Sequence, residues 1–150
     1  MSYSNVHFIL FKPQLAENIG ACARALKNFN FNKLRLVSPK MIFPNDKILA
    51  TSVGAKDVII SSKVYTAFED AIQDINCVIV TSSRIRKKNY RYLPISYLKK
   101  INFKKKVAIV FGPEASGLSN DELSYADYII KLPTNKNFQS LNLSHSLIII

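Results

Sequence analysis

Residues 107–119 read VAIVFGPEASGLS, and this stretch decides the fold. Its first five residues are apolar and predict a strand that is buried on both faces, as in a parallel sheet. Gly112 and Gly117 then permit tight turns, with Glu114 between them. Ser119 follows and, with an acid three residues later, has the spacing of a helix start. The stretch therefore predicts a strand, a loop and a helix.

The same alternation continues on both sides of this stretch. Further strands are expected at residues 6–11, 33–37, 58–60, 77–81 and 128–132, and further helices at residues 14–28 and 66–75. This order predicts an α/β fold with a mostly parallel sheet flanked by helices and with ligands beyond the carboxyl ends of the strands. The four glycines form neither GxGxxG nor GxxxxGK[ST], which excludes the usual dinucleotide-binding and P-loop sites.

Composition sets further bounds. The chain has 150 residues, enough for one domain over residues 1–150, and a formal net charge of +11, which suits a polyanionic partner or reflects compositional drift. Cys22 and Cys77 are isolated and form no metal-ligand spacing, so no metal site is expected. No segment is long and apolar enough to span a membrane, and no signal peptide is evident. We therefore expect a cytoplasmic protein.

Three clusters of polar residues could form a site. They are ENIGACAR at residues 17–24, FGPEASGL at residues 111–118 and FQSLNLS at residues 138–144. Each has a simpler interpretation as well, namely a solvated helix face, an ordinary loop, and a helix cap at Ser140. Spacing alone does not choose between these interpretations.

A basic stretch lies between the strand expected at residues 77–81 and the FGPEASGL loop. No acid occurs between Asp74 and Glu114, whereas ten of the 21 basic residues do. Tyr90, Tyr92 and Tyr97 are interleaved with them. Cations for phosphates and aromatic rings for unstacked bases indicate RNA binding. The RNA-binding residues that we predict are Arg84, Arg86, Lys87, Lys88 and Arg91.

Taken together, ENIGxxAR, FGxExxGL and [IL]P…SLN, in this order, resemble the SpoU (TrmH-like) branch of the SPOUT RNA methyltransferase superfamily, and most of all its TrmJ-type tRNA methyltransferases. The resemblance covers nearly the whole chain. It implies a C-terminal deep trefoil knot, a homodimer, and S-adenosylmethionine as the methyl donor, with S-adenosylhomocysteine as the product. It also implies that the last helix continues beyond Ile150, so the chain looks truncated there.

The resemblance further implies a role for each matching residue. Arg24 would act at the ribose with support from Asn18, Glu114 would hold the loop, and Ser140 and Asn142 would orient the target. The implied cofactor-binding residues are Thr81, Ser82, Ser83, Gly112, Leu132, Ser140, Leu141 and Asn142. Because a guanidinium keeps its proton, we expect Arg24 to stabilise the developing alkoxide rather than to act as a free base.

The implied function is 2'-O-ribose methylation of tRNA in the anticodon loop. Methylation of ribosomal RNA and a catalytically inactive RNA-binding relative are the alternatives. A flavodoxin-like signalling domain would explain only the sheet, because it has no use for FGPEASGL and SLN together. One departure from the family is Asn30, which stands where a glycine is usual and can adopt the same left-handed backbone.

Overall fold

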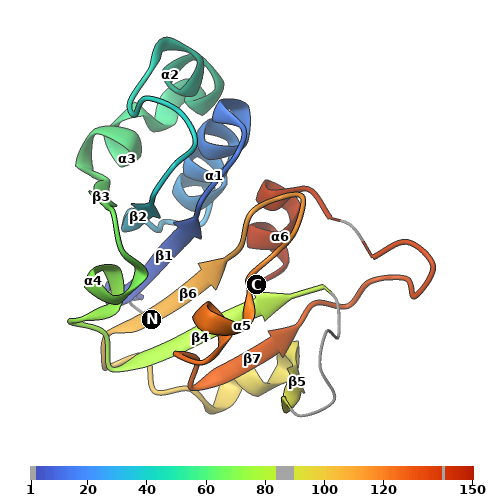
Figure 1. Cartoon of the computed structure of the whole chain (residues 1–150). Helices are drawn as coiled ribbons and strands as arrows, with labels where there is room; N and C mark the ends of the chain where they lie inside the picture. Colours follow the sequence, from blue (N-terminus) through green and yellow to red (C-terminus); the bar gives the residue numbers. More distant parts are fainter. Residues whose placement is uncertain (1–2, 84–89, 140) are drawn as a thin grey trace.

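A parallel sheet forms the centre of the molecule (Figure 1). The computed structural model describes residues 3–83, 90–139 and 141–150. Within these residues the strands are β1 (Val6–Phe11), β2 (Leu34–Val37), β3 (Lys63–Tyr65), β4 (Cys77–Ser82), β5 (Tyr92–Pro94), β6 (Val107–Phe111) and β7 (Tyr128–Lys131). All pairings between these strands are parallel. The predicted α/β class is confirmed.

The order of the strands is β3-β2-β1-β6-β4-β7-β5. β1 lies inside the sheet, where its Phe8 pairs with Leu34 of β2 on one side and with Ile109 of β6 on the other. Because the strands are parallel, their carboxyl ends meet at one edge. The loops after β1, β4, β6 and β7 are therefore neighbours, although they are far apart in the sequence.

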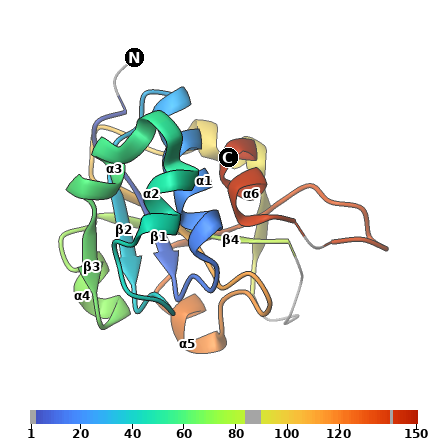
Figure 2. The same ribbon diagram turned by 90° about the horizontal axis from the view of Figure 1, so that it is seen from above.

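Helices cover both faces of the sheet (Figure 2). They are α1 (Ala16–Asn28), α2 (Asp46–Ser52), α3 (Lys56–Ser61), α4 (Phe68–Ile72), α5 (Asn120–Leu123) and α6 (Leu143–Ile149), with 3-10 turns η1 (Val53–Ala55) and η2 (Ile95–Lys100). Apolar residues of α1, α2, α3 and α6 pack on the face that carries Phe8 and Ile109, and those of α4 and α5 pack on the face that carries Ile9 and Val110. The flanking helices are as predicted.

Gly20 sets the separation of α1 and α2. A Cβ at this position would lie 2.7 Å from the carbonyl oxygen of Ile48 and 2.8 Å from the backbone nitrogen of Ser52. Both atoms belong to the α2 backbone and cannot rotate away. The glycine of the ENIGACAR motif is therefore required by helix packing, independently of any ligand.

The prediction of a strand at residues 58–60 is wrong, because these residues lie in α3. Val58 and Ile59 are buried against the sheet, whereas Ile60 is 74% exposed. Two buried neighbours followed by an exposed residue suit a helix, and a run of three apolar residues is too short to distinguish the two. The short strand occurs just afterwards, at Lys63–Tyr65.

Thr66 and Glu69 also have the S/T-x-x-E spacing of a capping box, but neither this pair nor Ser119 with Glu122 caps its helix as expected. α4 begins at Phe68 without a side-chain cap, ends at Ile72 rather than at residue 75, and its Glu69 accepts a hydrogen bond from the Tyr125 hydroxyl. The Ser119 hydroxyl precedes α5 but donates to the Glu122 carboxylate instead of accepting from a backbone N–H. Side-chain pairing has replaced backbone capping at both helices.

Two expectations about organisation stay predictions, namely the threading of the C-terminal segment into a knot and a single domain over residues 1–150. Among the described residues, no helix is long and apolar enough to cross a membrane.

Candidate functional site

A pocket lies at the carboxyl edge of the sheet, where three loops meet. Thr81 to Ser83 come from the end of β4, Leu132 follows β7, and the loop after β6 provides most of the rest. The complete lining is Thr81, Ser82, Ser83, Phe111, Gly112, Pro113, Glu114, Ala115, Ser116, Gly117, Leu118, Leu123, Leu132, Leu141, Leu143 and Ser146. The structure thus brings together all the predicted cofactor-binding residues that it describes except Asn142, which lies next to Leu141 and Leu143.

The loop after β6 closes tightly on itself. The backbone N–H of Gly117 donates to the carbonyl of Pro113 at 2.8 Å, and Gly117 has a φ of 68°. A Cβ on Gly112 would lie only 2.5 Å from the backbone nitrogen of Leu118. Because this contact is with backbone, a side chain at Gly112 would open the loop. The loop therefore offers its main chain to a ligand, which is the role that a glycine-rich turn has in other nucleotide sites.

Glu114 fastens this loop to the start of α1. Its carboxylate accepts hydrogen bonds from the backbone N–H groups of Gln14 and Leu15, each at 3.0 Å, and from Asn18 Nδ2 at 3.0 Å. In return, Gln14 Oε1 accepts from the backbone N–H of Ala115 at 2.9 Å. A carboxylate at a helix N-terminus satisfies free N–H groups and complements the helix dipole. Sequence analysis did not identify Gln14, whose only signal is its place between β1 and α1.

Asn142 extends the same connection to α6. Its Nδ2 donates to Asn18 Oδ1 at 3.2 Å, while its Oδ1 accepts from the backbone N–H of Ser144 at 2.9 Å and so caps α6. Asn18 is buried, with 6% of its surface exposed. Residues from all three sequence motifs are therefore joined in one chain of hydrogen bonds, Glu114 to Asn18 to Asn142.

Arg24 lies away from this pocket. It is exposed, does not line the pocket, and forms no hydrogen bond or ion pair with any other described residue. Six residues separate it from Asn18, which places it about 9 Å further along α1. Within one copy of the chain, the predicted catalytic arginine and the predicted cofactor site are not brought together.

The structure describes only part of the basic stretch in which RNA-binding residues were predicted. Arg84, Arg86, Lys87 and Lys88 lie outside the described residues, as does Ser140, and Arg91 is exposed just before β5. Lys104 to Lys106 immediately precede β6 and so lie at the amino edge of the sheet, opposite the pocket. These three lysines do not form one surface with the pocket, whereas the RNA-binding role of Arg84, Arg86, Lys87, Lys88 and Arg91 stays a prediction.

The interleaved tyrosines are half-buried and pack against other parts of the chain. Tyr90 and Tyr92 pack against the core under α4 and α5, and Tyr97 packs on Tyr128 with ring centroids 5.1 Å apart. In this part of the chain the tyrosines occupy half-buried positions, and neighbouring lysines such as Lys99 and Lys100 are exposed to solvent.

The pocket has few ionisable groups. Glu114 is the one acidic or basic residue among its described lining. Burial raises the pKa of the Cys22 thiol, which keeps this side chain protonated inside the core. Among the described residues, no group of three or more His, Cys, Asp or Glu side chains could hold a metal ion. The pocket therefore offers a ligand backbone groups, hydroxyls and one carboxylate.

The fold and the pocket together define a protein of the SPOUT class, in which loops at the carboxyl ends of late strands form the ligand site. The chain belongs to the SpoU rRNA Methylase family, whose sequence profile matches residues 5–150. The family predicted from the three motifs is confirmed.

Individual relatives agree with this assignment. The chain is 34% identical over 150 residues to the tRNA (cytidine-2'-O-)-methyltransferase TrmJ of Methanocaldococcus jannaschii, covering 97% of this chain and 65% of the relative. The crystal structure of TrmJ from Z. mobilis ZM4 superposes with a TM-score of 0.87 at 35% identity, covering 95% of this chain and 65% of that one. The chain thus spans about two thirds of the length of these relatives or slightly less.

A more distant structure shares the fold alone. The SpoU methyltransferase AviRb from Streptomyces viridochromogenes, solved in complex with the cofactor AdoMet, superposes with a TM-score of 0.72 at 18% identity, covering 97% of this chain and 56% of that one.

Proposed function

We propose that this chain carries out 2'-O-ribose methylation of tRNA, in the anticodon loop, with S-adenosylmethionine as methyl donor and S-adenosylhomocysteine as product. The observation that carries the proposal is the chain of hydrogen bonds from Glu114 through Asn18 to Asn142 beside a glycine-lined pocket. The names of the TrmJ relatives support the reaction and the substrate class. We place this activity in the cytoplasm.

The pocket suits S-adenosylmethionine in three respects. Leu118, Leu123 and Leu132 provide apolar walls for an adenine ring, and Thr81, Ser82 and Ser83 provide hydroxyls. The tight turn at Gly112, where a Cβ would meet the backbone of Gly117 and Leu118, sets the shape of the loop that lines the pocket. When bound, the donor would supply a methyl group on a sulfonium, which an oxygen nucleophile can accept without a metal.

The chain's own residues would position the ribose and stabilise its oxygen. Glu114 holds the loop and Asn18 holds Asn142, so that Asn142 and the neighbouring Ser140 orient the target nucleotide. Arg24 would stabilise the developing alkoxide while the 2'-hydroxyl passes its proton to water, its oxygen takes the methyl group, and the sulfur leaves as the neutral thioether of S-adenosylhomocysteine. Positioning of this kind can supply a large part of the rate enhancement.

We further propose that the active form is a homodimer in which Arg24 serves the pocket of the second copy. Its exposure and its absence from the pocket of its own chain support this arrangement. Phe29, Ile148 and Ile149 are also exposed, at 59%, 49% and 38%, and would be covered in a dimer. A two-fold interface places the same surface on both copies.

The proposal is tested by transfer of labelled methyl groups from S-adenosylmethionine to unmodified tRNA. We expect label in the tRNA ribose, and a decrease of about 100-fold or more in Arg24→Ala, the usual effect of removing one transition-state donor. Ribosomal RNA serves as a second substrate, because the family is described by rRNA methylation. Label in ribosomal RNA alone would show that ribosomal RNA, and not tRNA, is the substrate. Binding of RNA without methyl transfer would identify a catalytically inactive relative.

Complementation tests the dimer. Arg24→Ala and Gly112→Val are expected to be inactive separately. If Arg24 acts on the partner's pocket, an equal mixture that has exchanged subunits should recover about a quarter of the activity, because half of the dimers then carry one intact site of two. No recovery in a mixture shown to contain heterodimers would exclude this arrangement.

A further inference from the structure

A loop projects from the molecule between β7 and α6, and both ends of this loop reach the pocket. Leu132 at its start and Leu141 near its end are pocket-lining residues. Two perpendicular views show the loop extending away from the sheet and the helices (Figures 1 and 2). A ligand that fills the pocket would therefore contact both ends of this loop.

The tip of the loop is a turn held by its own hydrogen bonds. The backbone N–H of Phe138 donates to the carbonyl of Asn135 at 3.1 Å, and the backbone N–H of Asn137 donates to Asn135 Oδ1 at 2.8 Å. Asn135 and Phe138 also form an isolated antiparallel bridge. These bonds fix the backbone of Phe138 and leave its side chain outside the turn.

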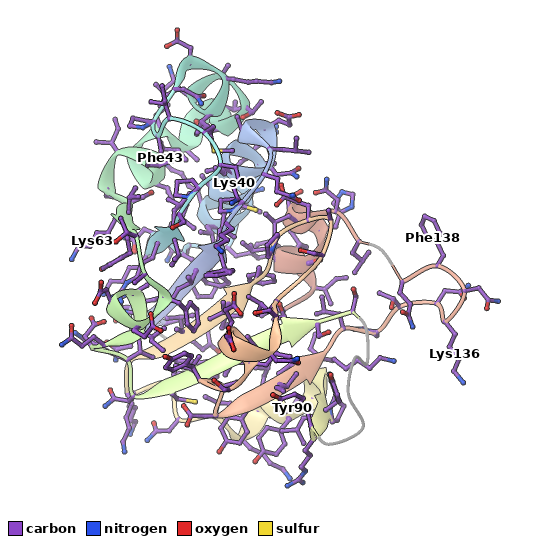
Figure 3. The ribbon with its side chains drawn as sticks, in the orientation of Figure 1. Lys40, Phe43, Lys63, Tyr90, Lys136 and Phe138 are labelled. Carbon is purple, nitrogen blue, oxygen red and sulfur yellow. The ribbon has the colours of Figure 1, made fainter. Side chains whose placement is uncertain are left out.

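Phe138 is exposed without an aromatic partner. Its exposed fraction is 76%, and among the described residues no other ring packs against it. Figure 3 shows Phe138 and Lys136 projecting from the tip of the loop on opposite sides, both away from the body of the protein. Tyr90, Tyr92 and Tyr97 are half-buried, so the ring of Phe138 is more accessible to a base than theirs.

The charge around this ring favours a polyanion. Lys131 and Lys136 are the charged residues after Asp127, and no acid follows Asp127 in the printed sequence. An isolated exposed phenylalanine is unremarkable in itself. The turn carries an exposed ring and a lysine, and the loop has pocket-lining residues at both ends. These match the two requirements of unpaired RNA, which are a stacking surface and phosphate neutralisation.

We infer that Phe138 stacks on an unpaired base of the substrate RNA next to the target nucleotide, while Lys136 contacts a backbone phosphate. This inference rests on the proposed function and identifies a specific contact with its substrate. The loop would bind RNA segments whose bases are unstacked and would not distinguish among the four bases, because every base has a face for stacking. Phe138 is a binding residue and takes no part in the methyl transfer.

The test uses the absence of tryptophan from the sequence. Phe138→Trp introduces a single indole, whose fluorescence we expect to be quenched when unmodified tRNA is added, as stacking on a base requires. Ile60→Trp is the matched control, because Ile60 is also exposed, at 74%, but lies on α3, outside the pocket lining and the proposed dimer interface. Equal quenching in both variants, or none in Phe138→Trp while tRNA binds, would overturn the inference.

Kinetics supply the second measurement. Phe138→Ala should raise the Kd and KM for tRNA by about tenfold, the usual loss when a stacking ring is removed, and should leave the affinity for S-adenosylmethionine unchanged. Lys136→Ala should reduce the slope of log Kd against log salt concentration by about one. A dimer lost in Phe138→Ala would assign the ring to a protein interface instead.

The two proposals can fail separately. Absence of methyl transfer by the unaltered protein would refute the proposed function. Efficient transfer to tRNA together with an unchanged KM in Phe138→Ala would refute only the role of Phe138.

Discussion

Asn18 donates a hydrogen bond from its Nδ2 to the Glu114 carboxylate at 3.0 Å, across 96 positions of sequence. Its Oδ1 simultaneously accepts from Asn142 Nδ2. The amide of Asn18 is therefore oriented by a carboxylate on one side and a donor on the other, and both ends of this side chain are needed. Neither an acid nor an aliphatic residue can replace it.

Asn18→Asp should disrupt this connection. The substitution places a second carboxylate next to that of Glu114 in a buried position, so a donor is lost and like charges meet. We expect the free energy of unfolding to fall by about 3 kcal/mol, as measured by urea denaturation at pH 7. Asn120→Asp, at the exposed start of α5, is the control and should be neutral or slightly stabilising. Equal stability of the two variants would contradict this account.

Gly112→Ala should abolish cofactor binding while preserving the fold. The new Cβ would meet the backbone of Gly117 and Leu118 and open the loop. We expect the affinity for S-adenosylmethionine, measured by calorimetry, to decrease by at least about tenfold, which corresponds to 1.4 kcal/mol of binding free energy. Gly54→Ala is the matched control, because nothing lies within 4 Å of the Cβ that would be added there. Wild-type affinity in Gly112→Ala would show that the loop does not hold the ligand.

Asp74→Ala should destabilise the protein through Arg35. Arg35 is almost fully buried in β2, donates to the Asp74 carboxylate at 2.6 and 2.8 Å, and donates to the carbonyl of Ala71. The hydrogen bonds from Arg35 hold the pKa of Asp74 well below its usual range. Removing Asp74 leaves a buried cation, and because Asp74 itself is half-exposed we expect a loss of about 2 kcal/mol in thermal or urea unfolding.

Asp57→Ala is the control for this pair. Asp57 bonds to Lys27 at a similar distance, 2.8 Å, but both side chains are largely exposed. Surface pairs contribute little, so its removal should leave the midpoint of unfolding nearly unchanged. If both substitutions had the same effect, burial of Arg35 would not be the cause.

His7 should make stability depend on pH. Burial, reinforced by the cation of Arg35, lowers the pKa of His7 to about 4. The unfolded chain therefore binds more protons than the folded protein between about pH 6.5 and 4. The free energy of unfolding should fall by up to about 3 kcal/mol as the pH is lowered through this window, and the contribution of His7 should level off below it.

His7→Leu should flatten this part of the stability profile. The replacement also removes Nε2, a buried nitrogen that has no hydrogen-bond partner among the described residues. His145→Leu, which alters an exposed position on α6, should retain the slope. An unchanged slope in His7→Leu would assign the pH dependence to carboxylates instead.

The sheet could be predicted from the sequence because its strands are buried on both faces and appear as continuous apolar runs. The bounds of β1 and β6 agree with the expected ranges at both ends. Asn30 has the left-handed φ of 64° that its place in the motif indicated. Between residues 41 and 60 the sequence predicted only a strand at residues 58–60, which is wrong, because the helices of this segment are short and give no clear period.

The sequence predicted which residues form the pocket but not how they are arranged or hydrogen-bonded. The motifs identified Gly112, Glu114 and Asn142, whereas spacing within the sequence could not show that Glu114 would cap α1. Spacing also could not show that Lys104 to Lys106, at the end of the basic stretch, would lie at the edge of the sheet opposite the pocket. A linear run of charge carries no information on which edge of a sheet each residue will reach.

The central position of β1 has a consequence for the order of folding. β1 pairs with β2 after a short crossover, but its other neighbour is β6, whose Val107 lies 101 positions beyond its partner Val6. Closing so long a loop is entropically costly and slow, whereas the unit of β1, α1 and β2 needs only local contacts. During synthesis this amino-terminal unit can therefore form first, with one edge of β1 left unpaired until β6 emerges. Chaperones that cover exposed strand edges should bind the nascent chain in this interval, and release it once residues 107–111 have left the ribosome.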